Sequence, residues 1–255
     1  SVAILARGQQ RLDEAVTKIE HFRRDVSQKI IPITANVADS AAIKQTIHDL
    51  VSSHGLPDLL INCAGVAKSS YAEMTPLEDF RWIMDIDFHG TVNVTQTLLP
   101  DFIGRGSGHI VNISSLAGVI GMFGYTAYSG AKFAVKGYTD VLRSEMKPYG
   151  VDVSCVFPPD TDTPQLAWEN QFKPFETHMI AGSDKPFPAE KVAKSIVLGV
   201  QKNKYIIVPG LEAKLFYFLA THLGGLVYTV LDILVKNAIK KKVAVQGAHT
   251  EKHSR

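Results

Sequence analysis

The alternation of short apolar runs with helical stretches constrains the fold of this chain more than any other feature. The runs are rich in valine and isoleucine, and they read VAILA, KIIPITANV, DLLINCAG, GHIVNISS, VDVSCVFPP and YIIVPG. Strands that are apolar on both faces and separated by helices form a parallel sheet covered on each side. The sequence therefore predicts an α/β fold with a doubly wound parallel sheet. We expect helices near 11–22, 39–54, 76–90, 91–104, 128–148 and 189–201.

Composition narrows the class of protein. The chain has 255 residues, of which 45% are hydrophobic and 20% charged, enough for one large α/β domain. A net charge of +2 does not suggest a nucleic-acid partner. Basic residues gather in the tail, residues 236–255, which has six Lys or Arg and one acidic residue, Glu251. The basic positions are 236, 240, 241, 242, 252 and 255.

The two cysteines and the first residues set further expectations. Cys63 and Cys155 both fall in apolar runs that we interpret as buried strands, so we predict no disulfide, no metal site and a reducing compartment. The opening residues SVAILAR resemble a strand already under way rather than a signal peptide. We therefore expect the chain to be truncated at its front.

Polar and small residues follow three of the predicted strands, at the edge where doubly wound sheets bind ligands. Asn62-Cys63-Ala64-Gly65 would let a flat ligand approach the backbone. Ser114-Ser115 follows the strand GHIVNI. The turn PPDTDTP, which begins at Pro158, offers hydroxyls and backbone amides to a phosphate or an amide. Each motif alone has an ordinary structural interpretation, but the three reinforce one another.

Tyr128 and Lys132 are four residues apart near the start of a predicted helix. Residues at this spacing lie on one helix face, so the phenol and the ammonium point the same way. The ordinary interpretation of a lone Tyr-x-x-x-Lys is a surface tyrosine and a solvated lysine. The alternative is an acid whose proton is loosened by a neighbouring positive charge.

Asn62-Ala64-Gly65, Ser115 and Tyr128-x-x-x-Lys132 together resemble the short-chain dehydrogenase/reductase family, over roughly residues 1–210. The resemblance implies a Rossmann-type domain. It implies that Tyr128 is the general acid, that Lys132 favours the phenolate and bonds the nicotinamide ribose, and that Ser115 donates to the substrate oxygen. Asp87 stands where the family usually has an asparagine that holds a relay water.

The segments MKPYGVDVSCVF, PPDTDTP and ENQFKPFET are similar to the 3-ketodihydrosphingosine reductase branch of the family. The resemblance implies NADPH-dependent reduction of a long-chain 3-keto amino alcohol. A reductase of steroid, retinoid or other lipid ketones is the alternative within the enzymes. A weakly active binding or regulatory relative is the alternative from another class.

The expected cofactor is NADPH. Arg7 follows the first predicted strand, where NAD enzymes place an acidic residue, and a guanidinium there suits a 2′-phosphate. Asn36-Val37 resembles the family's adenine-contacting pair, and the resemblance places Thr163 at the nicotinamide or pyrophosphate. The glycine-rich turn that binds the pyrophosphate is missing from these residues, and we expect the fragment to bind NADPH poorly.

Residues 211–255 form an apolar segment with a basic end. Leu215 to Val235 is 21 residues long, carries one formal charge, Asp232, and matches the roughly 30 Å core of a bilayer. A spanning helix, an interfacial helix and a packing or dimer helix all remain open. We expect a membrane-associated protein of the endoplasmic reticulum with its active site facing the cytosol. The resemblance favours a homodimer or tetramer.

Overall fold

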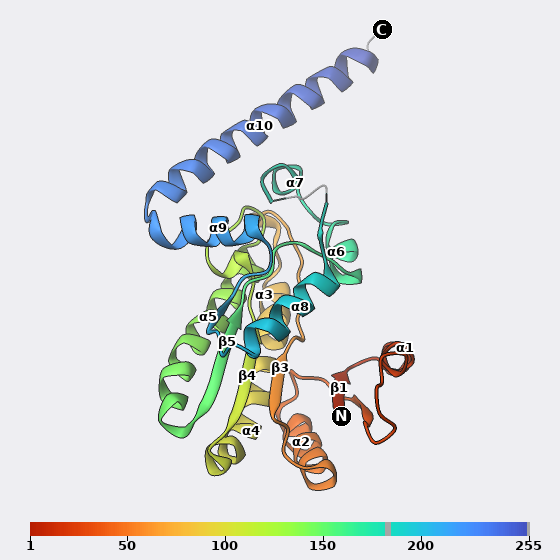
Figure 1. Cartoon of the computed structure of the whole chain (residues 1–255). Coiled ribbons are helices and arrows are strands. Elements are labelled where there is room, and N and C mark those ends of the chain that lie inside the picture. Colours follow the sequence, from red (N-terminus) through yellow and green to blue (C-terminus); the bar gives the residue numbers. More distant parts are fainter. Residues whose placement is uncertain (182–184, 254–255) are drawn as a thin grey trace.

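The computed structural model of the chain describes residues 1–181 and 185–253, and it confirms the predicted α/β architecture. Every strand pair is parallel, and helices cover the strands (Figure 1). The main strands are β1 (Val2–Ala6), β2 (Ile30–Thr34), β3 (Leu59–Asn62), β4 (Gly108–Ile113), β5 (Val151–Val156) and β8 (Ile206–Ile207). All six fall within the apolar runs of the sequence.

The strands form two main sheets rather than the single sheet that the sequence predicts. One sheet has the order β3-β4-β5-β8, and the other is the pair β1-β2 (Figure 1). A third, small sheet pairs β6 (Thr161–Asp162) with β7 (Phe187–Pro188). Apolar patterning predicts that a segment becomes a strand, but it does not say which strand lies beside it. Sheet membership depends on hydrogen bonds between segments distant in sequence.

The helices agree with the sequence to within a few residues. The longer ones in the body are α1 (Gln9–Glu20), α2 (Ser40–His54), α4 (Gly90–Arg105), α5 (Thr126–Met146) and α8 (Ala189–Val200). The helix expected over 76–90 is divided into α3 (Leu77–Ile83) and a π-helical turn, Met84–His89. The sequence did not predict two short helices after β5, α6 (Pro164–Glu169) and α7 (Phe175–Ala181). At six and seven residues they have too few turns for a clear periodicity.

The main core lies between the four-stranded sheet and helices α2, α4 and α5. Phe102 of α4 and Ile110 of β4 are fully buried there and pack with Leu98 and Leu142. Burial of side chains of this size contributes about 1.5–3 kcal/mol each. This core fixes α4 and α5 against the strands, so the start of α5 is held at their carboxyl ends.

A chain of polar side chains is buried beneath the carboxyl ends of β3 and β4. Asn62 Nδ2 donates to Thr95 Oγ1 and to Asn112 Oδ1, both at 2.8 Å. Asn112 Nδ2 donates to Thr139 Oγ1 at 3.0 Å, and this hydroxyl donates to the Val135 carbonyl. These bonds link two strands with α4 and α5 and therefore fix how the elements of the site are spaced.

The two cysteines differ in environment. Cys155 is buried within β5, as the sequence predicts. The prediction for Cys63 was wrong, because β3 ends at Asn62 and the Cys63 side chain is exposed beyond it. The apolar run continues past the last strand residue, and so the run alone does not mark where the strand ends.

The C-terminal segment is helical but not continuous. The helices α9 (Leu211–His222) and α10 (Leu226–His253) are separated at Leu223–Gly225, where Gly224 has a φ of +53°. A single helix over 215–235 is therefore not formed. No helix in the described part of the chain is by itself long and apolar enough to cross a bilayer. The pair α9 and α10 up to Val245 reaches that length and composition, with a 120° bend at the break.

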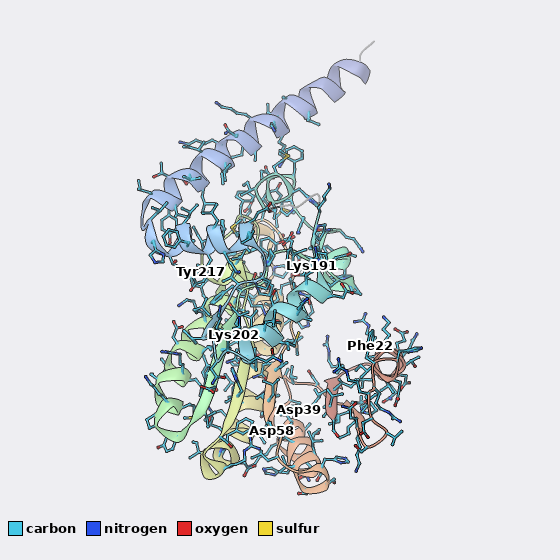
Figure 2. All side chains as sticks on the ribbon, in the orientation of Figure 1. Phe22, Asp39, Asp58, Lys191, Lys202 and Tyr217 are labelled. Atoms are coloured by element: carbon cyan, nitrogen blue, oxygen red, sulfur yellow. The ribbon has the colours of Figure 1, made fainter. Side chains whose placement is uncertain are left out.

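Side chains hold both C-terminal helices to the body. On α9, the Tyr217 ring lies 5.1 Å from the ring of Phe157, which follows β5 (Figure 2). Lys242 of α10 lies 2.9 Å from Glu176 of α7 and 2.7 Å from the hydroxyl of Tyr71. The segment is thus docked on the domain while much of its apolar surface stays exposed.

Candidate active site

The candidate site lies at the carboxyl ends of β3, β4 and β5, where their connections meet the start of α5 (Figure 1). The Leu116 amide donates to the Pro158 carbonyl at 3.2 Å, which joins the loop after β4 to the loop after β5. Ser114 Oγ donates to the carbonyl of Lys132 at 2.9 Å and ties the same loop to α5. Three strand ends and one helix therefore converge on one small volume.

Lys132 is directed from α5 toward the end of β4. Its Nζ donates to the Ile113 carbonyl at 3.1 Å and lies 5.6 Å from the centroid of the Tyr128 ring. The lysine is buried and the tyrosine is half-buried. The four-residue spacing predicted from the sequence thus brings the phenol and the ammonium to one face of α5. The surface interpretation of this pair is excluded by its burial.

Asp87 forms an ion pair with Lys132. Its Oδ2 lies 3.0 Å from Lys132 Nζ, and its Oδ1 accepts a 2.7 Å hydrogen bond from the Val66 amide. The carboxylate is fully buried in the π-helical turn Met84–His89. A π-helical turn shifts side chains relative to an α-helix and is frequent at functional sites. A buried aspartate at this position therefore neutralises the lysine.

The charges around Tyr128 oppose one another. The net pKa of Tyr128 is raised to about 12, with burial as the largest cause. Lys132 and a hydrogen bond with Ser115 lower this pKa, whereas Asp87 raises it further. Burial lowers the pKa of Lys132, but Asp87 and Tyr128 raise it more strongly, and the net direction is upward. Tyr128 is therefore a protonated phenol at neutral pH, suited to donate a proton rather than to accept one.

Ser115 lies on the same side of the site. It begins a single 3₁₀ turn, Leu116–Gly118, and its Oγ accepts a 3.1 Å hydrogen bond from the Ala117 amide. The hydroxyl proton is then free to point toward an acceptor near Tyr128, because the backbone bond uses an oxygen lone pair. The four residues predicted as catalytic, Ser115, Tyr128, Lys132 and Asp87, are thus gathered in one place.

The loop after β3 provides a close backbone approach. A Cβ added at Gly65 would lie 3.3 Å from Lys132 Nζ and 3.4 Å from either Asp87 oxygen. Ala64 is exposed and small, whereas Asn62 is buried and engaged with Thr95 and Asn112. These residues fit a flat nicotinamide group laid against the backbone, with Asn62 supporting the loop from inside.

The residues predicted to bind the adenosine half lie on the other sheet. Arg7 follows β1 and is exposed. Asn36 follows β2 and is also exposed, and its Oδ1 accepts from the Ala38 amide at 3.2 Å. Val37 is buried, and its carbonyl accepts from Asn93 of α4 at 2.8 Å. An exposed guanidinium and an exposed amide suit a phosphate and an adenine edge.

Thr163 and Pro158 belong to the loop after β5. Thr163 Oγ1 accepts from the Leu166 amide at 3.3 Å and donates to the Thr161 carbonyl at 3.2 Å, which caps α6. The Pro158 carbonyl accepts from Leu116. Both residues therefore shape the loop that borders the site, and their predicted contacts with a cofactor stay predictions.

Sequence reasoning missed a buried group beside Tyr128. The ring of Tyr125 lies 5.6 Å from that of Tyr128, and its hydroxyl donates to Glu169 at the end of α6. Both residues are buried. They are 44 positions apart, so no short motif joins them. The one available signal was that Glu169 begins the segment ENQFKPFET of the branch resemblance, while Tyr125 stands three residues before Tyr128.

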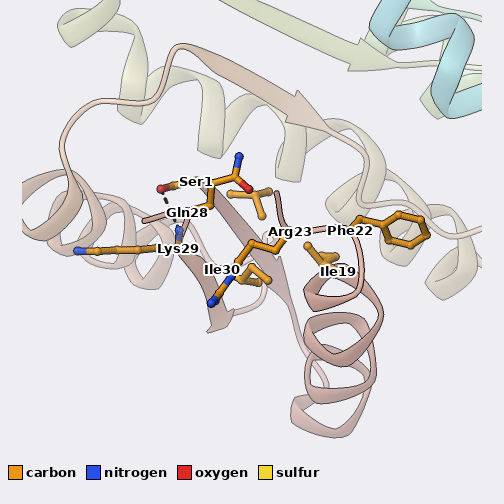
Figure 3. Close-up of a pocket in the computed structure, with 8 residues that line it drawn as sticks. Ser1, Ile19, Phe22, Arg23, Gln28, Lys29 and Ile30 are labelled. Atoms are coloured by element: carbon orange, nitrogen blue, oxygen red, sulfur yellow. Dashed lines mark hydrogen bonds between the residues drawn. The ribbon is translucent and has the colours of Figure 1, made fainter. Parts of the chain in front are cut away.

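A surface pocket lies away from this site. It is lined by residues of β1, α1, β2 and the connection from α1 to β2, among them Val2, Ile19, Phe22 and Ile30 (Figure 3). Val2 and Ile30 are the first residues of parallel strands, so the pocket is at the amino ends of those strands. Ligands of doubly wound sheets bind at the opposite ends. The catalytic constellation described above is therefore a better candidate than this pocket.

Comparison with known proteins places the chain in a family. A family model described as short chain dehydrogenase matches residues 1–173, and the chain belongs to this family. It is 37% identical to a 3-dehydrosphinganine reductase of Danio rerio over 197 residues, 77% of this chain and 59% of the relative. It is 39% identical to a 3-ketodihydrosphingosine reductase of Dictyostelium discoideum over 223 residues, 86% of this chain and 64% of the relative.

The chain thus spans 59% to 64% of the length of these curated relatives. Among solved structures it resembles a short-chain dehydrogenase from Streptomyces avermitilis, with a TM-score of 0.72, 23% identity and coverage of 97% of this chain and 89% of the other. The apo form of LigD from Sphingobium gives a TM-score of 0.72 at 25% identity, covering 88% and 84%. These likenesses confirm the Rossmann-type fold.

Proposed function

We propose that residues 1–210 form the catalytic domain of an NADPH-dependent reductase that converts 3-ketodihydrosphingosine to dihydrosphingosine. The observation that carries the proposal is a proton donor beside a cation at the strand ends: Ser115 and Tyr128 are half-buried there, next to the buried ion pair of Lys132 and Asp87. The similarity to curated reductases of this lipid supports the substrate.

The residues divide the chemistry as follows. The hydride for the ketone carbon would come from NADPH when it is bound. Ser115 donates a hydrogen bond to the ketone oxygen, which holds it beside the phenol and stabilises developing negative charge. Tyr128 transfers its proton to that oxygen, and the resulting phenolate is stabilised by Lys132. Asp87 holds Lys132 in place through the ion pair.

Cofactor choice rests on Arg7. Charge-assisted hydrogen bonds to a phosphate contribute about 1.5–3 kcal/mol, which corresponds to about a 10-fold to 150-fold preference for NADPH over NADH. Asn36 and Val37 would adjoin the adenine, and Gly65, Ala64, Pro158 and Thr163 would adjoin the nicotinamide side. No acidic residue directly follows β1, where a ribose 2′-hydroxyl would need one.

The membrane is the second partner that we propose, through the segment 211–255. Exposed apolar side chains cover α9 and the first half of α10, and lysines follow them at 236, 240 and 241. This combination suits a helix lying in the interface of an anionic membrane. We place the protein at the endoplasmic reticulum with its site toward the cytosol, where a lipid substrate is at hand.

The test of the activity is NADPH oxidation with 3-ketodihydrosphingosine by the purified protein carrying a glycine-rich nucleotide-binding turn ahead of β1, run beside a steroid ketone and beside NADH. We expect turnover with the sphingoid ketone, with NADPH favoured by the factor given above. Turnover only with the steroid ketone would contradict the substrate, and turnover only with NADH would contradict the role of Arg7.

Flotation with liposomes tests the membrane proposal without an assay of activity. Replacing Leu215, Phe218 and Ile233 with serine should abolish flotation on anionic vesicles, because these exposed side chains supply the apolar contact. The matched control replaces three exposed apolar residues of the body, Val141, Val197 and Leu198, and should float normally. Equal flotation of both variants would contradict the proposal.

A further inference from the structure

Four polar side chains form a buried cluster next to the proposed catalytic tyrosine. Tyr125 donates to Glu169 Oε1, and Lys173 Nζ lies 3.5 Å from the same oxygen. Lys173 also contacts Asp160 Oδ2 at 3.1 Å. The mechanism derived above uses none of these groups. Asp160 is half-buried and the other three are buried, so the cluster is not a solvated surface network.

The charges of this cluster do not cancel. Two carboxylates, Asp160 and Glu169, face one ammonium, Lys173, which leaves a formal charge of −1. Burial raises the pKa of Glu169 and sets the net direction upward, although the bonds from Tyr125 and Lys173 lower it. Among the described residues both polar contacts of Glu169 fall on Oε1, so Oε2 has capacity for another donor. A buried negative charge without a full partner favours the arrival of a second cation.

The cluster is within reach of the reacting atoms. The ring centroids of Tyr125 and Tyr128 are 5.6 Å apart, and the Tyr125 hydroxyl donates a hydrogen bond to Glu169. The charge of Glu169 also raises the pKa of Tyr128, although its effect is smaller than those of burial, Lys132 and Asp87. A cation bound at Glu169 would therefore lie close to the ketone that Tyr128 protonates.

Apolar surface adjoins the same carboxylate. Trp168 and Phe172, on either side of Glu169 in sequence, are 39% and 40% exposed, which is unusual for side chains of their size. Their ring centroids are 4.8 Å apart, and Trp168 is 6.2 Å from Trp82, which packs in one cluster with Tyr128. This aromatic surface is independent of the charges, and it suits the hydrocarbon part of a ligand.

We propose that Glu169, oriented by Tyr125, binds the ammonium group of the substrate, so that the site selects amphiphilic ketones with an amino group next to the carbonyl. The inference rests on the proposed function for the identity of the reacting carbon. In a 3-keto-2-amino alcohol the ammonium is one carbon from the ketone, which matches the contact between Tyr125 and Tyr128. The alkyl chain lies along Trp168 and Phe172, and Lys173 keeps its bond to Asp160.

Intrinsic fluorescence gives a test that does not depend on turnover. The chain has two tryptophans, Trp82 and Trp168, and both lie at the aromatic surface. Dihydrosphingosine and octadecane-1,3-diol, which differ only by the amino group, are titrated in the same detergent. We expect the wild-type protein to bind the amine at least about tenfold more tightly than the diol. Glu169→Gln, which keeps the shape and removes the charge, should bring this ratio close to one.

The matched control is Glu176→Gln. Glu176 is as buried as Glu169, at 4% against 6% exposed, and it is likewise bonded to a tyrosine and a lysine, Tyr71 and Lys242. Its replacement should leave the ratio unchanged. Equal binding of the two ligands by the wild type would overturn the proposal, as would an unchanged ratio or an equal loss of both affinities in Glu169→Gln.

A folding defect in Glu169→Gln, seen by circular dichroism, makes Tyr125→Phe the deciding variant. The carboxylate remains in that variant but loses the hydroxyl that orients it, so the preference for the amine should be reduced and not abolished, and a complete loss would assign recognition to the phenol instead. The proposed function is judged separately. A protein that prefers the amine but reduces no long-chain ketone would refute the proposed function and support the ammonium site. Turnover without any preference for the amine would support the function and refute the ammonium site.

Discussion

The strand ends bury polar side chains, whereas the C-terminal helices expose apolar ones. At the ends of β3 and β4, Asp87, Asn112 and Thr139 are fully buried and each has a partner. On α10, Leu226 and Tyr228 expose 65% and 62% of their surface. Buried polar groups are costly unless paired, so the first region is built for fixed geometry. Exposed apolar surface gains free energy when covered, so the second is suited to contact.

The two regions meet at one anchor. Lys242 of α10 lies 5.0 Å from the centroid of the Tyr71 ring, and both residues bond to the buried Glu176 of α7. Thr177, next to Glu176, donates to the Phe123 carbonyl at 3.0 Å, just before the start of α5. A contact-forming helix is thus connected through α7 to the loop that precedes Tyr128.

The largest effect is expected at the strand ends, for Tyr128→Phe. Removing the phenolic hydroxyl removes the proton donor, so kcat should fall at least about 100-fold, the usual scale for general acid catalysis. The matched control is Tyr138→Phe on the same helix, where the hydroxyl accepts a 3.2 Å bond from Gln96. Steady-state NADPH oxidation measures both. Near-normal turnover in Tyr128→Phe would contradict the proposed mechanism.

The next largest effect is a difference in how much a substitution in each region lowers the free energy of unfolding. Asn112→Leu leaves one donor of Asn62 unpaired in the core and should lower the free energy of unfolding by about 1–3 kcal/mol. Ile233→Ser on α10 changes a side chain that is already 53% exposed, and should alter it by less than about 0.5 kcal/mol. Urea unfolding of both variants is the measurement. Equal losses of unfolding free energy would mean that the buried polar residues contribute no more to stability than the exposed apolar ones.

A change of pH dependence is expected for Asp87→Asn. Asp87 raises the pKa of Tyr128, whereas Lys132 lowers it. Removing the carboxylate charge leaves the lysine unopposed, so the pKa of Tyr128 should move down from about 12. Because the phenol must be protonated for reduction, activity should be lost at a lower pH than in the wild type. A pH profile of kcat with unchanged alkaline limb would contradict the role of this carboxylate.

The smallest effect concerns the anchor. Lys242→Met keeps an apolar stem but removes the ammonium from Glu176 and Tyr71. We expect faster amide exchange in α10 and α7 and unchanged exchange in β4 and β5, because only the docking contact is lost. The control is Lys240→Met, two residues earlier. Identical exchange in the two variants would show that the anchor does not hold α10.

The elements with long or strongly apolar patterns could be predicted from the sequence. β1 was predicted at its observed bounds, and α2 and α4 to within one residue, because each has a clear period and β1 is rich in branched apolar side chains. The helix over 76–90 was predicted as one unit, although a π-helical turn interrupts it. Asp87 is fully buried within this turn, and a single π-helical turn has no local sequence signature.

The sequence by itself determined the parallel α/β class and the single face of α5 that carries Tyr128 and Lys132. The class follows from strands that are apolar on both faces and separated by helices, and the shared face follows from the helical period of 3.6 residues. The tertiary structure alone decided that β1 and β2 form a separate sheet, that Asp87 neutralises Lys132, and that Glu169 accepts a hydrogen bond from Tyr125, whose ring adjoins Tyr128. These facts join residues far apart in the chain. They depend on which surfaces pack together and which charges lose their water, and no local pattern encodes either.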